Sequence, residues 1–186
     1  MSEEGEGTPA ERAGLVLVYT GDGKGKTTAA LGLALRMLGH GWKVLVLQFL
    51  KGPLASGELV AGKRLAPGLS IRTLGRGYVH LVDGKPKPED VEHARQSWEQ
   101  ARLAVRGDRY DAVVLDEANV LTSLGLVEVR QVLALMEEAR RRRITLILTG
   151  RGADARVIEQ ADIVTEMKSV KHVLETGRSD IPAIER

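Results

Sequence analysis

Short runs rich in apolar residues recur along the chain, separated by polar loops or by segments with a helical period. Several runs lack polar alternation, which is typical of parallel strands buried on both faces. We predict strands over residues 15–20, 44–47, 70–74, 112–115, 144–148 and 163–167. Because helical segments alternate with these runs, we expect an α/β three-layer sandwich whose mostly parallel sheet has about six strands.

Apolar residues at helical spacing predict the helices between these strands. Residues 29–38, 88–105, 129–139 and 153–160 carry this period. The segment that begins at Pro88 places Val91, Ala94, Trp98, Ala101 and Val105 on one face, which we expect to be buried. Gly32 lies inside the first helix, where glycine costs about 1 kcal/mol relative to alanine, and this suggests close packing on the sheet.

Two stretches are expected to be loops, at residues 51–69 and 75–88, because both contain glycine and proline and show no sustained period. Long loops inside a domain of this size are usually functional. At 186 residues the chain is long enough for one domain with a sizeable core. We therefore expect a flexible arm over residues 1–13, a single domain over 14–177 and a short tail over 178–186.

The most informative motif follows the first predicted strand and precedes the first predicted helix. Glycines in such a strand-turn-helix setting let several backbone N–H groups point at one anion, and the helix N-terminus adds its positive end. Lys26 would supply a mobile charge for phosphates and Thr27 a hydroxyl for Mg²⁺. The predicted nucleotide-binding residues are Gly21, Asp22, Gly23, Lys24, Gly25, Lys26, Thr27 and Thr28.

This motif is a variant of the usual phosphate-binding loop. The common spacing would need a glycine where this chain has Thr20, so its phosphates need not lie as in an ordinary ATPase. A glycine-rich β-turn with solvated lysines is the alternative interpretation. The surrounding strand and helix favour the phosphate site, and with it a P-loop NTPase fold of the RecA-like kind.

Charged residues follow two further predicted strands. Asp116 and Glu117 come directly after the run at 112–115, where the sheet's carboxyl edge would bring them beside the phosphate loop to hold Mg²⁺. Arg151 follows the run at 144–148 and would bring a fork of donors suited to an oligophosphate or a carboxylate. A strand-ending turn and a surface arginine are the simpler alternatives for these residues.

Composition excludes several classes of protein. The net charge is only +2 and aromatic residues make up 3%, so we expect no nucleic-acid partner. The basic run 140–143 ends a helical pattern, where cations favour the helix dipole. Without cysteine there is no disulfide framework, and no run has the roughly 18 to 20 apolar residues of a membrane span. The acidic N-terminus is no secretory signal, so we expect a cytoplasmic protein without membrane association.

Five segments, taken together and in order, resemble the P-loop type of ATP:cob(I)alamin (corrinoid) adenosyltransferase. The similarity extends from about Gly14 to Gly177, and the shortened loop is itself a feature of that family. The segments are Tyr19-Thr20-Gly21-Asp22-Gly23-Lys24-Gly25-Lys26-Thr27-Thr28-Ala29-Ala30, Gln48-Phe49-Leu50-Lys51-Gly52, Val114-Leu115-Asp116-Glu117-Ala118-Asn119, Leu148-Thr149-Gly150-Arg151 and Val170-Lys171-His172.

The resemblance implies a reaction at carbon. In that family the Co(I) of a reduced corrinoid attacks C5′ of ATP, which forms a cobalt–carbon bond to 5′-deoxyadenosyl and releases triphosphate. Co(I) is already a strong nucleophile, so positive charge on the departing triphosphate matters more than a base. Lys26, Glu117 and Arg151 are then the expected catalytic residues, with Mg²⁺ or Mn²⁺ held by Thr27, Asp116 and Glu117.

The corrinoid and partner predictions also come from the resemblance. The family has Gly-Phe-any-Trp where this chain has Gly77 to His80, so Tyr78 and His80 are the expected corrinoid-binding residues. His80 has three open roles: ligand of cobalt, hydrogen-bond donor to the corrin side chains, or neither; we favour a residue that does not bind cobalt. The corrinoid would be cob(I)alamin or cob(I)yrinic acid a,c-diamide. A reductase partner and a homodimer are further expectations.

Two other functions stay open on the sequence alone. A P-loop ATPase or kinase would transfer the γ-phosphoryl group, with Glu117 as base or metal ligand. A non-catalytic ATP sensor would use the loops at 51–69 and 75–88 to bind a protein. The first predicts phosphate release without corrinoid, and the second predicts ATP binding without turnover.

Overall fold

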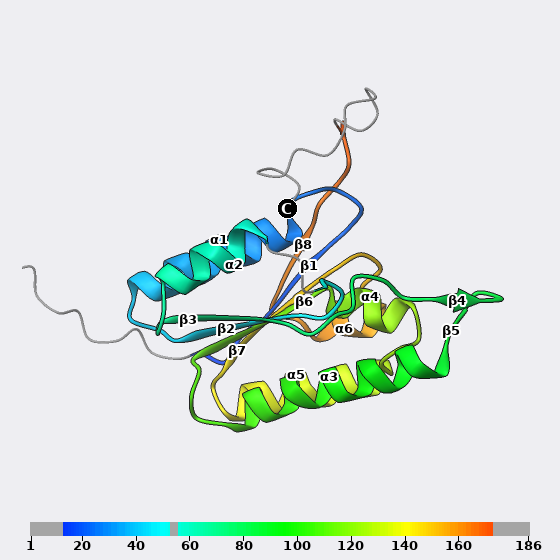
Figure 1. The fold of residues 1–186 in the computed structure, drawn as a ribbon. Helices are drawn as coiled ribbons and strands as arrows, with labels where there is room; N and C mark the ends of the chain where they lie inside the picture. The colour runs from blue at the N-terminus through cyan, green and yellow to red at the C-terminus, as the bar shows by residue number, and fades with distance from the viewer. Residues whose placement is uncertain (1–12, 53–55, 173–186) are drawn as a thin grey trace, which may run out of the picture.

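The computed structural model describes residues 13–52 and 56–172. In this range the chain forms a sheet between two layers of helices (Figure 1), which confirms the predicted three-layer α/β architecture. The predicted tail, and the predicted arm except for residue 13, lie outside the described residues.

The main sheet has six strands in the order β3-β2-β6-β7-β1-β8, and every neighbouring pair is parallel. The first strand therefore does not touch β6, because β7 lies between them. Parallel strands bring all their carboxyl ends to one edge, and this edge collects the loops that carry the predicted site. The strands are β1 Val16–Thr20, β2 Val44–Gln48, β3 Leu69–Thr73, β6 Ala112–Asp116, β7 Thr145–Thr149 and β8 Ile163–Glu166.

Helices cover both faces of the sheet (Figure 1). The first two helices lie on one face and the other four on the opposite face, where α3 contacts α5 and α5 contacts α6. A two-stranded hairpin, β4 Leu81–Val82 with β5 Lys85–Pro86, projects beyond the start of α3. The helices are α1 Lys26–Gly39, α2 Gly57–Arg64, α3 Pro88–Arg106, α4 Ala118–Ser123, α5 Val129–Arg141 and α6 Ala155–Gln160.

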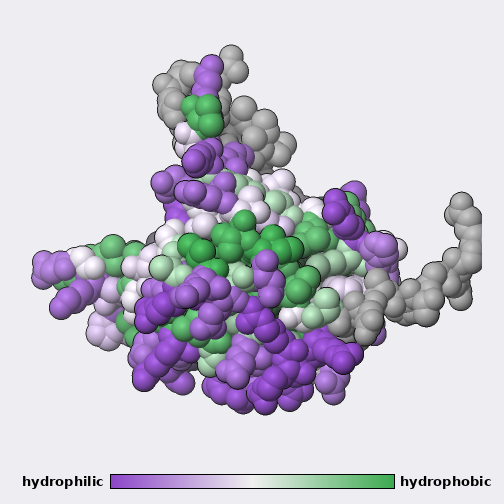
Figure 2. Space-filling view, turned by 180° about the vertical axis from the view of Figure 1, so that it is seen from behind, coloured by the Kyte–Doolittle hydropathy of each residue, from purple (hydrophilic) through white to green (hydrophobic). Residues whose placement is uncertain are grey.

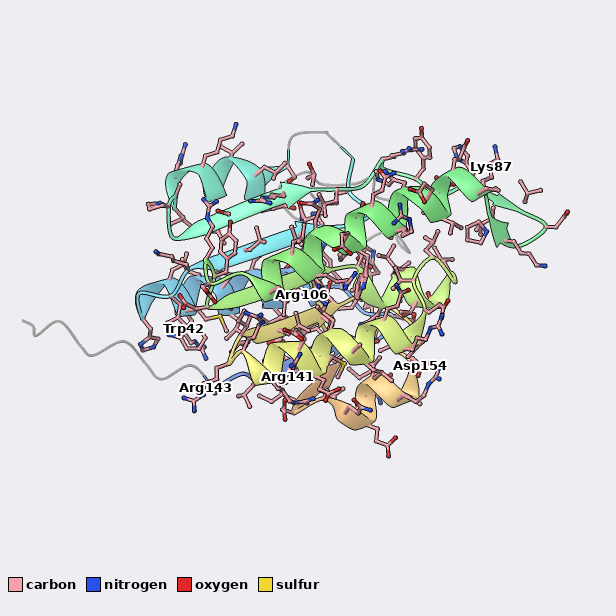
Figure 3. The ribbon with its side chains drawn as sticks, turned by 90° about the horizontal axis from the view of Figure 1, so that it is seen from below. Trp42, Lys87, Arg106, Arg141, Arg143 and Asp154 are labelled. Carbon is pink, nitrogen blue, oxygen red and sulfur yellow. The ribbon has the colours of Figure 1, made fainter. Side chains whose placement is uncertain are left out.

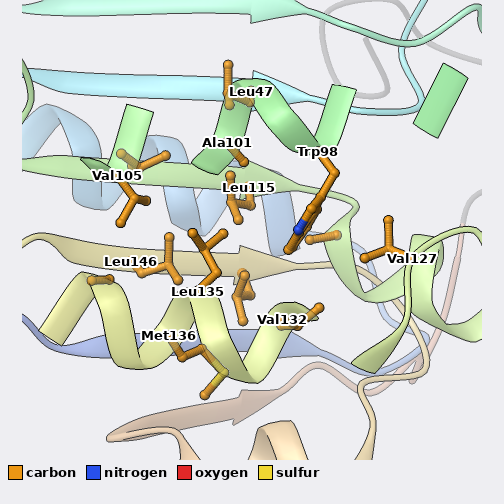
Figure 4. Close-up of a cluster of buried hydrophobic side chains, with 14 of the residues drawn as sticks. Leu47, Trp98, Ala101, Val105, Leu115, Val127, Val132, Leu135, Met136 and Leu146 are labelled. Carbon is orange, nitrogen blue, oxygen red and sulfur yellow. The ribbon is translucent and has the colours of Figure 1, made fainter. Parts of the chain in front are cut away.

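The core has two parts, one on each face of the sheet. Successive residues of a strand point to opposite faces, so Val16 and Val18 pack on the α3 and α5 side while Leu17 packs on the α1 side. Figure 4 shows the larger part, in which Trp98 of α3 and Met136 of α5 meet the strand side chains. Trp98 stacks on Phe49 with ring centroids 5.8 Å apart. The prediction that Trp98 belongs to the core is confirmed.

Five details of the structure differ from the sequence analysis. Gly32 is exposed, and a Cβ there would meet nothing within 4 Å, so it does not mark close packing. Val91 is also exposed, because α3 begins beyond the edge of the sheet. The stretch 51–69 contains the helix α2, and 75–88 contains the β4–β5 hairpin. Helix α4, directly after the acidic pair, was not predicted.

Figure 2 shows a patch of hydrophobic residues on the side opposite to the view of Figure 1, with hydrophilic residues around and below it. The exposed hydrophobic residues include Ile163 and Val164 of the edge strand β8. Within the described ranges, no helix is both long and apolar enough to cross a membrane.

Candidate functional site

The predicted phosphate loop connects β1 to α1, and its glycines have the backbone conformation that only glycine adopts easily. Gly21 has a φ of 89° and Gly25 a φ of 114°. The loop is also bonded to the segment after β8, because Gly23 N–H donates to Met167 O at 2.7 Å and Met167 N–H donates to Thr20 O at 2.8 Å. A Cβ at Gly21 would lie 2.4 Å from Met167 O. A Cβ at Gly23 would lie 2.7 Å from Lys168 O, so the segment after β8 requires glycine at both positions.

Lys26 opens α1 and is folded back over the loop. Its Nζ donates to Gly21 O at 2.7 Å and to Gly23 O at 2.8 Å, and the residue is only 8% exposed. Burial lowers the pKa of Lys26, and the positive charge of Arg151 lowers it further, whereas Glu117 and Asp22 oppose this effect. The ammonium group therefore lies inside the loop, within electrostatic reach of Arg151 and Glu117.

Asp116 connects the phosphate loop to two strand ends. Its Oδ1 accepts hydrogen bonds from Thr27 Oγ1 at 2.7 Å and from Thr149 Oγ1 at 2.8 Å, and the residue has no exposed surface. Its Oδ2 accepts a longer bond from Gln48 Nε2 at 3.3 Å. A fully buried carboxylate needs such partners, and here they come from the ends of β2 and β7 and from the first turn of α1.

Glu117 follows Asp116 in a left-handed conformation, with a φ of 66°. Its N–H donates to Thr149 Oγ1 at 3.0 Å, which holds the turn against β7. Burial and the neighbouring charge of Asp116 raise the pKa of Glu117, whereas Lys26, Arg151 and Lys51 oppose the rise. The tight turn thus places a second carboxyl among three cations, at the edge of the sheet that carries the phosphate loop.

The oxygen atoms around Asp116 fit a magnesium ion bound together with phosphates. Thr27 Oγ1 and Asp116 Oδ1 are 2.7 Å apart, and hard oxygen ligands from one or two side chains plus substrate phosphates are what Mg²⁺ prefers. In the described part of the chain, no group of three or more His, Cys, Asp or Glu side chains is arranged to hold a metal by itself. An ion at Thr27 and Asp116 would need further oxygen ligands from outside these two side chains.

Lys51, Glu58 and Gln48 form a network that the sequence analysis did not find. Glu58, in the first turn of α2, accepts a short hydrogen bond from Lys51 Nζ and one of 3.2 Å from Gln48 Nε2. Through Gln48 this network reaches Asp116. Gln48 and Lys51 belong to one of the segments of the resemblance, but their link to Glu58 was not predicted because α2 itself was expected to be loop.

The loop after β3 carries the two predicted corrinoid-binding residues. The rings of Tyr78 and His80 are in edge contact with centroids 4.6 Å apart, and Tyr78 is 59% exposed. His80 N–H donates to Asp90 Oδ2 at 2.9 Å, and His80 Nδ1 is 3.6 Å from the same oxygen. Both rings thus face outward from a backbone that is tied to α3.

Comparison with known proteins decides which family the chain represents. Residues 12–185 match the model of the family described as ATP:corrinoid adenosyltransferase BtuR/CobO/CobP. The chain belongs to this family of corrinoid adenosyltransferases.

Relatives among the corrinoid adenosyltransferases align over most of their length. The one from a Sinorhizobium species is 36% identical over 171 residues, which cover 91% of this chain and 79% of that protein. The one from Pseudomonas aeruginosa is 37% identical over 167 residues, with coverages of 90% and 81%. The one from Escherichia coli strain K12 is 35% identical over 168 residues, with coverages of 90% and 83%.

A more distant structural relative supports the fold alone. The flagellar accessory protein FlaH from Methanocaldococcus jannaschii superposes with a TM-score of 0.58, over 83% of this chain and 71% of that one. The two sequences are 13% identical, so the likeness concerns the arrangement of helices and strands and carries nothing about activity.

The family member described here thus gathers its predicted site residues in two places. Lys26, Thr27, Asp116 and Glu117 lie together at the phosphate loop, with Arg151 within electrostatic reach. Tyr78 and His80 lie on a separate loop, which follows the edge strand β3. Their roles as catalytic and binding residues stay predictions.

Proposed function

We propose that this protein transfers the 5′-deoxyadenosyl group of ATP to the Co(I) of a reduced corrinoid. The C5′–oxygen bond of ATP breaks, a cobalt–carbon bond forms with the electron pair of Co(I), and triphosphate leaves. The observation that carries the proposal is the match of residues 12–185 to the corrinoid adenosyltransferase family. The substrates are thus ATP and a corrinoid.

The phosphate loop would hold the triphosphate while it departs. Residues 21–28 would provide backbone N–H groups, apart from Gly23, whose N–H is bonded to Met167 O. Lys26, already buried against the loop, would exchange its bonds to two carbonyls for bonds to phosphate oxygens. Arg151 would add a second positive charge, and its effect on the pKa of Lys26 supports a position nearby. Charge that builds up on a leaving triphosphate is stabilised most by such fixed cations.

Magnesium, or manganese, would bind at Thr27, Asp116 and Glu117. The bound ion would supply positive charge to the phosphate oxygens. Glu117 then acts as a ligand and not as the base that activates water in an ATPase. Its position among Lys26, Arg151 and Lys51 supports an electrostatic role.

Tyr78 and His80 would contact the corrinoid. Their exposed, touching rings offer an apolar surface of the kind that packs on a flat macrocycle. We expect Tyr78→Ala to slow adenosylation severalfold and to leave the ATP affinity nearly unchanged, as measured by steady-state rates and by nucleotide titration. Equal loss of both would show that Tyr78 is not specific to the corrinoid.

Three further elements of the proposal concern the setting of the reaction. A reductase is needed to deliver Co(I), and we expect it to be a separate protein. We also expect a homodimer and a cytoplasmic location. Light scattering of the purified protein, with and without ATP, would test the dimer.

The decisive experiment mixes the purified protein with ATP, Mg²⁺ and chemically reduced cob(I)alamin without oxygen. The expected result is a light-sensitive adenosyl product together with triphosphate, followed in the visible spectrum. A parallel reaction with cob(I)yrinic acid a,c-diamide covers the second corrinoid. Phosphate release that does not depend on either corrinoid would instead favour an ATPase, and ATP binding without any turnover would favour a sensor.

A further inference from the structure

The buried face of α3 changes character along its length. Its later half presents Trp98, Ala101 and Val105 to the sheet, as an ordinary core helix does. Its first half buries two polar residues beside Ala94, with Asp90 5% and Ser97 6% exposed. A buried carboxylate is costly unless it binds something specific, so the polar half has a partner other than the core.

That partner is the loop after β3. Asp90 Oδ2 accepts from His80 N–H at 2.9 Å, which fixes the far end of the loop. His93 Nε2 lies 2.6 Å from Leu74 O, and because a carbonyl only accepts, the imidazole donates there. Ser97 Oγ donates to the same carbonyl at 3.4 Å. We call Asp90, His93 and Ser97 the α3 clamp.

The clamp holds the backbone and leaves the Tyr78 ring outside its contacts, whereas His80 Nδ1 lies 3.6 Å from Asp90 Oδ2. Between the two clamped ends, Gly77 N–H donates to Leu50 O at 3.1 Å, and beyond them Lys87 N–H donates to His80 O at 3.1 Å. The side chains of Tyr78 and His80 nevertheless stay 59% and 46% exposed. Figure 3 shows Lys87 at the end of α3 from which the hairpin projects, far along the helix from Arg106.

We propose that Asp90, His93 and Ser97 are positioning residues that fix the loop bearing Tyr78 and His80 for contact with the corrinoid. This inference rests on the proposed function for what the loop binds. It adds three residues to the corrinoid site that do not touch the substrate themselves and that belong to none of the segments of the family resemblance. Fixing the loop beforehand removes the free energy of ordering it when the corrinoid binds.

The test compares three variants of one helix. Asp90→Ala removes the acceptor for His80 N–H, Asp90→Asn keeps an acceptor oxygen at the same place without the charge, and Glu92→Ala is the control. Glu92 lies on the exposed face of α3, where it pairs only with Arg95 and Gln96 in the described structure. Circular dichroism and thermal unfolding would check that each variant is folded.

Two measurements test the clamp separately from the reaction: hydrogen exchange of the His80 amide and the kinetics of adenosylation. In the protein without substrates, the His80 amide should exchange its hydrogen at least about tenfold faster in Asp90→Ala than in wild type, because it loses its partner. In the adenosylation assay the same variant should raise the KM for the corrinoid about tenfold, equivalent to about 1.4 kcal/mol, with less than twofold change in ATP affinity. In Asp90→Asn, the exchange rate of the His80 amide and the KM for the corrinoid should both return most of the way to their wild-type values. Glu92→Ala should change neither quantity.

Each other outcome has a definite meaning. Unchanged exchange of the His80 amide in Asp90→Ala would overturn the clamp. Faster exchange with an unchanged corrinoid KM would overturn its role in positioning. If wild type transfers no adenosyl group, the proposed function fails, and exchange still decides whether the clamp holds the loop. Should Asp90→Ala not fold, His93→Leu removes the shorter of the two hydrogen bonds to Leu74 O; it should raise the KM for the corrinoid with less than twofold change in ATP affinity, and an unchanged KM would overturn the positioning role.

Discussion

Glu58 gives the sharpest prediction about stability. It lies in the first turn of α2, its side chain is 13% exposed, and it accepts from Lys51 and Gln48. Burial by itself raises the pKa of Glu58, but hydrogen bonds from Lys51, from its own backbone and from Gln48 outweigh it and lower the pKa from 4.5 to about 2. The ionised carboxylate is therefore stabilised by folding.

The magnitude follows from this lowered pKa. At about 1.36 kcal/mol per pKa unit, the ionised form would contribute at most about 3.4 kcal/mol to the free energy of unfolding. The side chain of Lys51 is 36% exposed, so solvent screens part of this, and we expect about 1 to 2 kcal/mol at neutral pH. Because the folded pKa is the lower one, the contribution is complete above pH 4.5 and is lost as the pH falls from 4.5 towards 2.

The assay is urea unfolding of wild type and Glu58→Gln at pH 7 and at steps down to pH 3. The variant should be less stable by about 1 to 2 kcal/mol at pH 7, and the difference should shrink below pH 4.5. Glu159→Gln, an exposed position on α6, is the matched control and should change little at any pH. A difference that is absent at pH 7, or that stays constant down to pH 3, would refute the electrostatic reasoning.

Three further predictions concern the phosphate loop and its neighbours. Burial and Asp116 raise the pKa of Glu117, so its ionised form opposes folding as the pH rises above 4.5. Glu117→Gln should therefore raise the unfolding temperature at pH 7, and this gain should disappear below pH 4.5. Scanning calorimetry at a series of pH values measures it, and a lower unfolding temperature of the variant at pH 7 would contradict the reasoning. Gly21→Ala should cost about 1 to 3 kcal/mol in chemical unfolding, because its Cβ would meet Met167 O at 2.4 Å, whereas Gly39→Ala, with open space around it, should cost nothing; equal behaviour would contradict the packing. Lys26→Met should lower kcat at least about 100-fold in the adenosylation assay while the protein stays folded, and a smaller loss would remove Lys26 from the charge that stabilises the leaving group.

The sheet was predictable because its signal is local. The runs Val44–Leu47 and Leu146–Leu148 are apolar throughout, and a strand buried on both faces leaves few other interpretations. The site followed in outline, because parallel strands bring their carboxyl ends to one edge whatever their order. Thus Thr27 and Asp116 meet although they lie far apart in the sequence.

What failed depends on distant contacts. Helix α2 has little apolar face and contains two glycines, so it depends on packing against β3, which has no local signal. Gly32 shows the opposite error, because a helix tolerates an exposed glycine that needs no packing reason. Asp90 lies in the first turn of α3, where any acid is favourable, and only the structure shows that it is buried against His80.

The bonds between the phosphate loop and Met167 have a consequence for nucleotide affinity. They continue the hydrogen bonding between β1 and β8 past the end of both strands, so the sheet itself holds the start of the loop in place. A loop that the sheet already orders loses little conformational entropy when a triphosphate enters it. Preorganisation of this kind should appear as a modest entropic penalty on ATP binding in calorimetry, and it ties the affinity for ATP to the integrity of an edge strand.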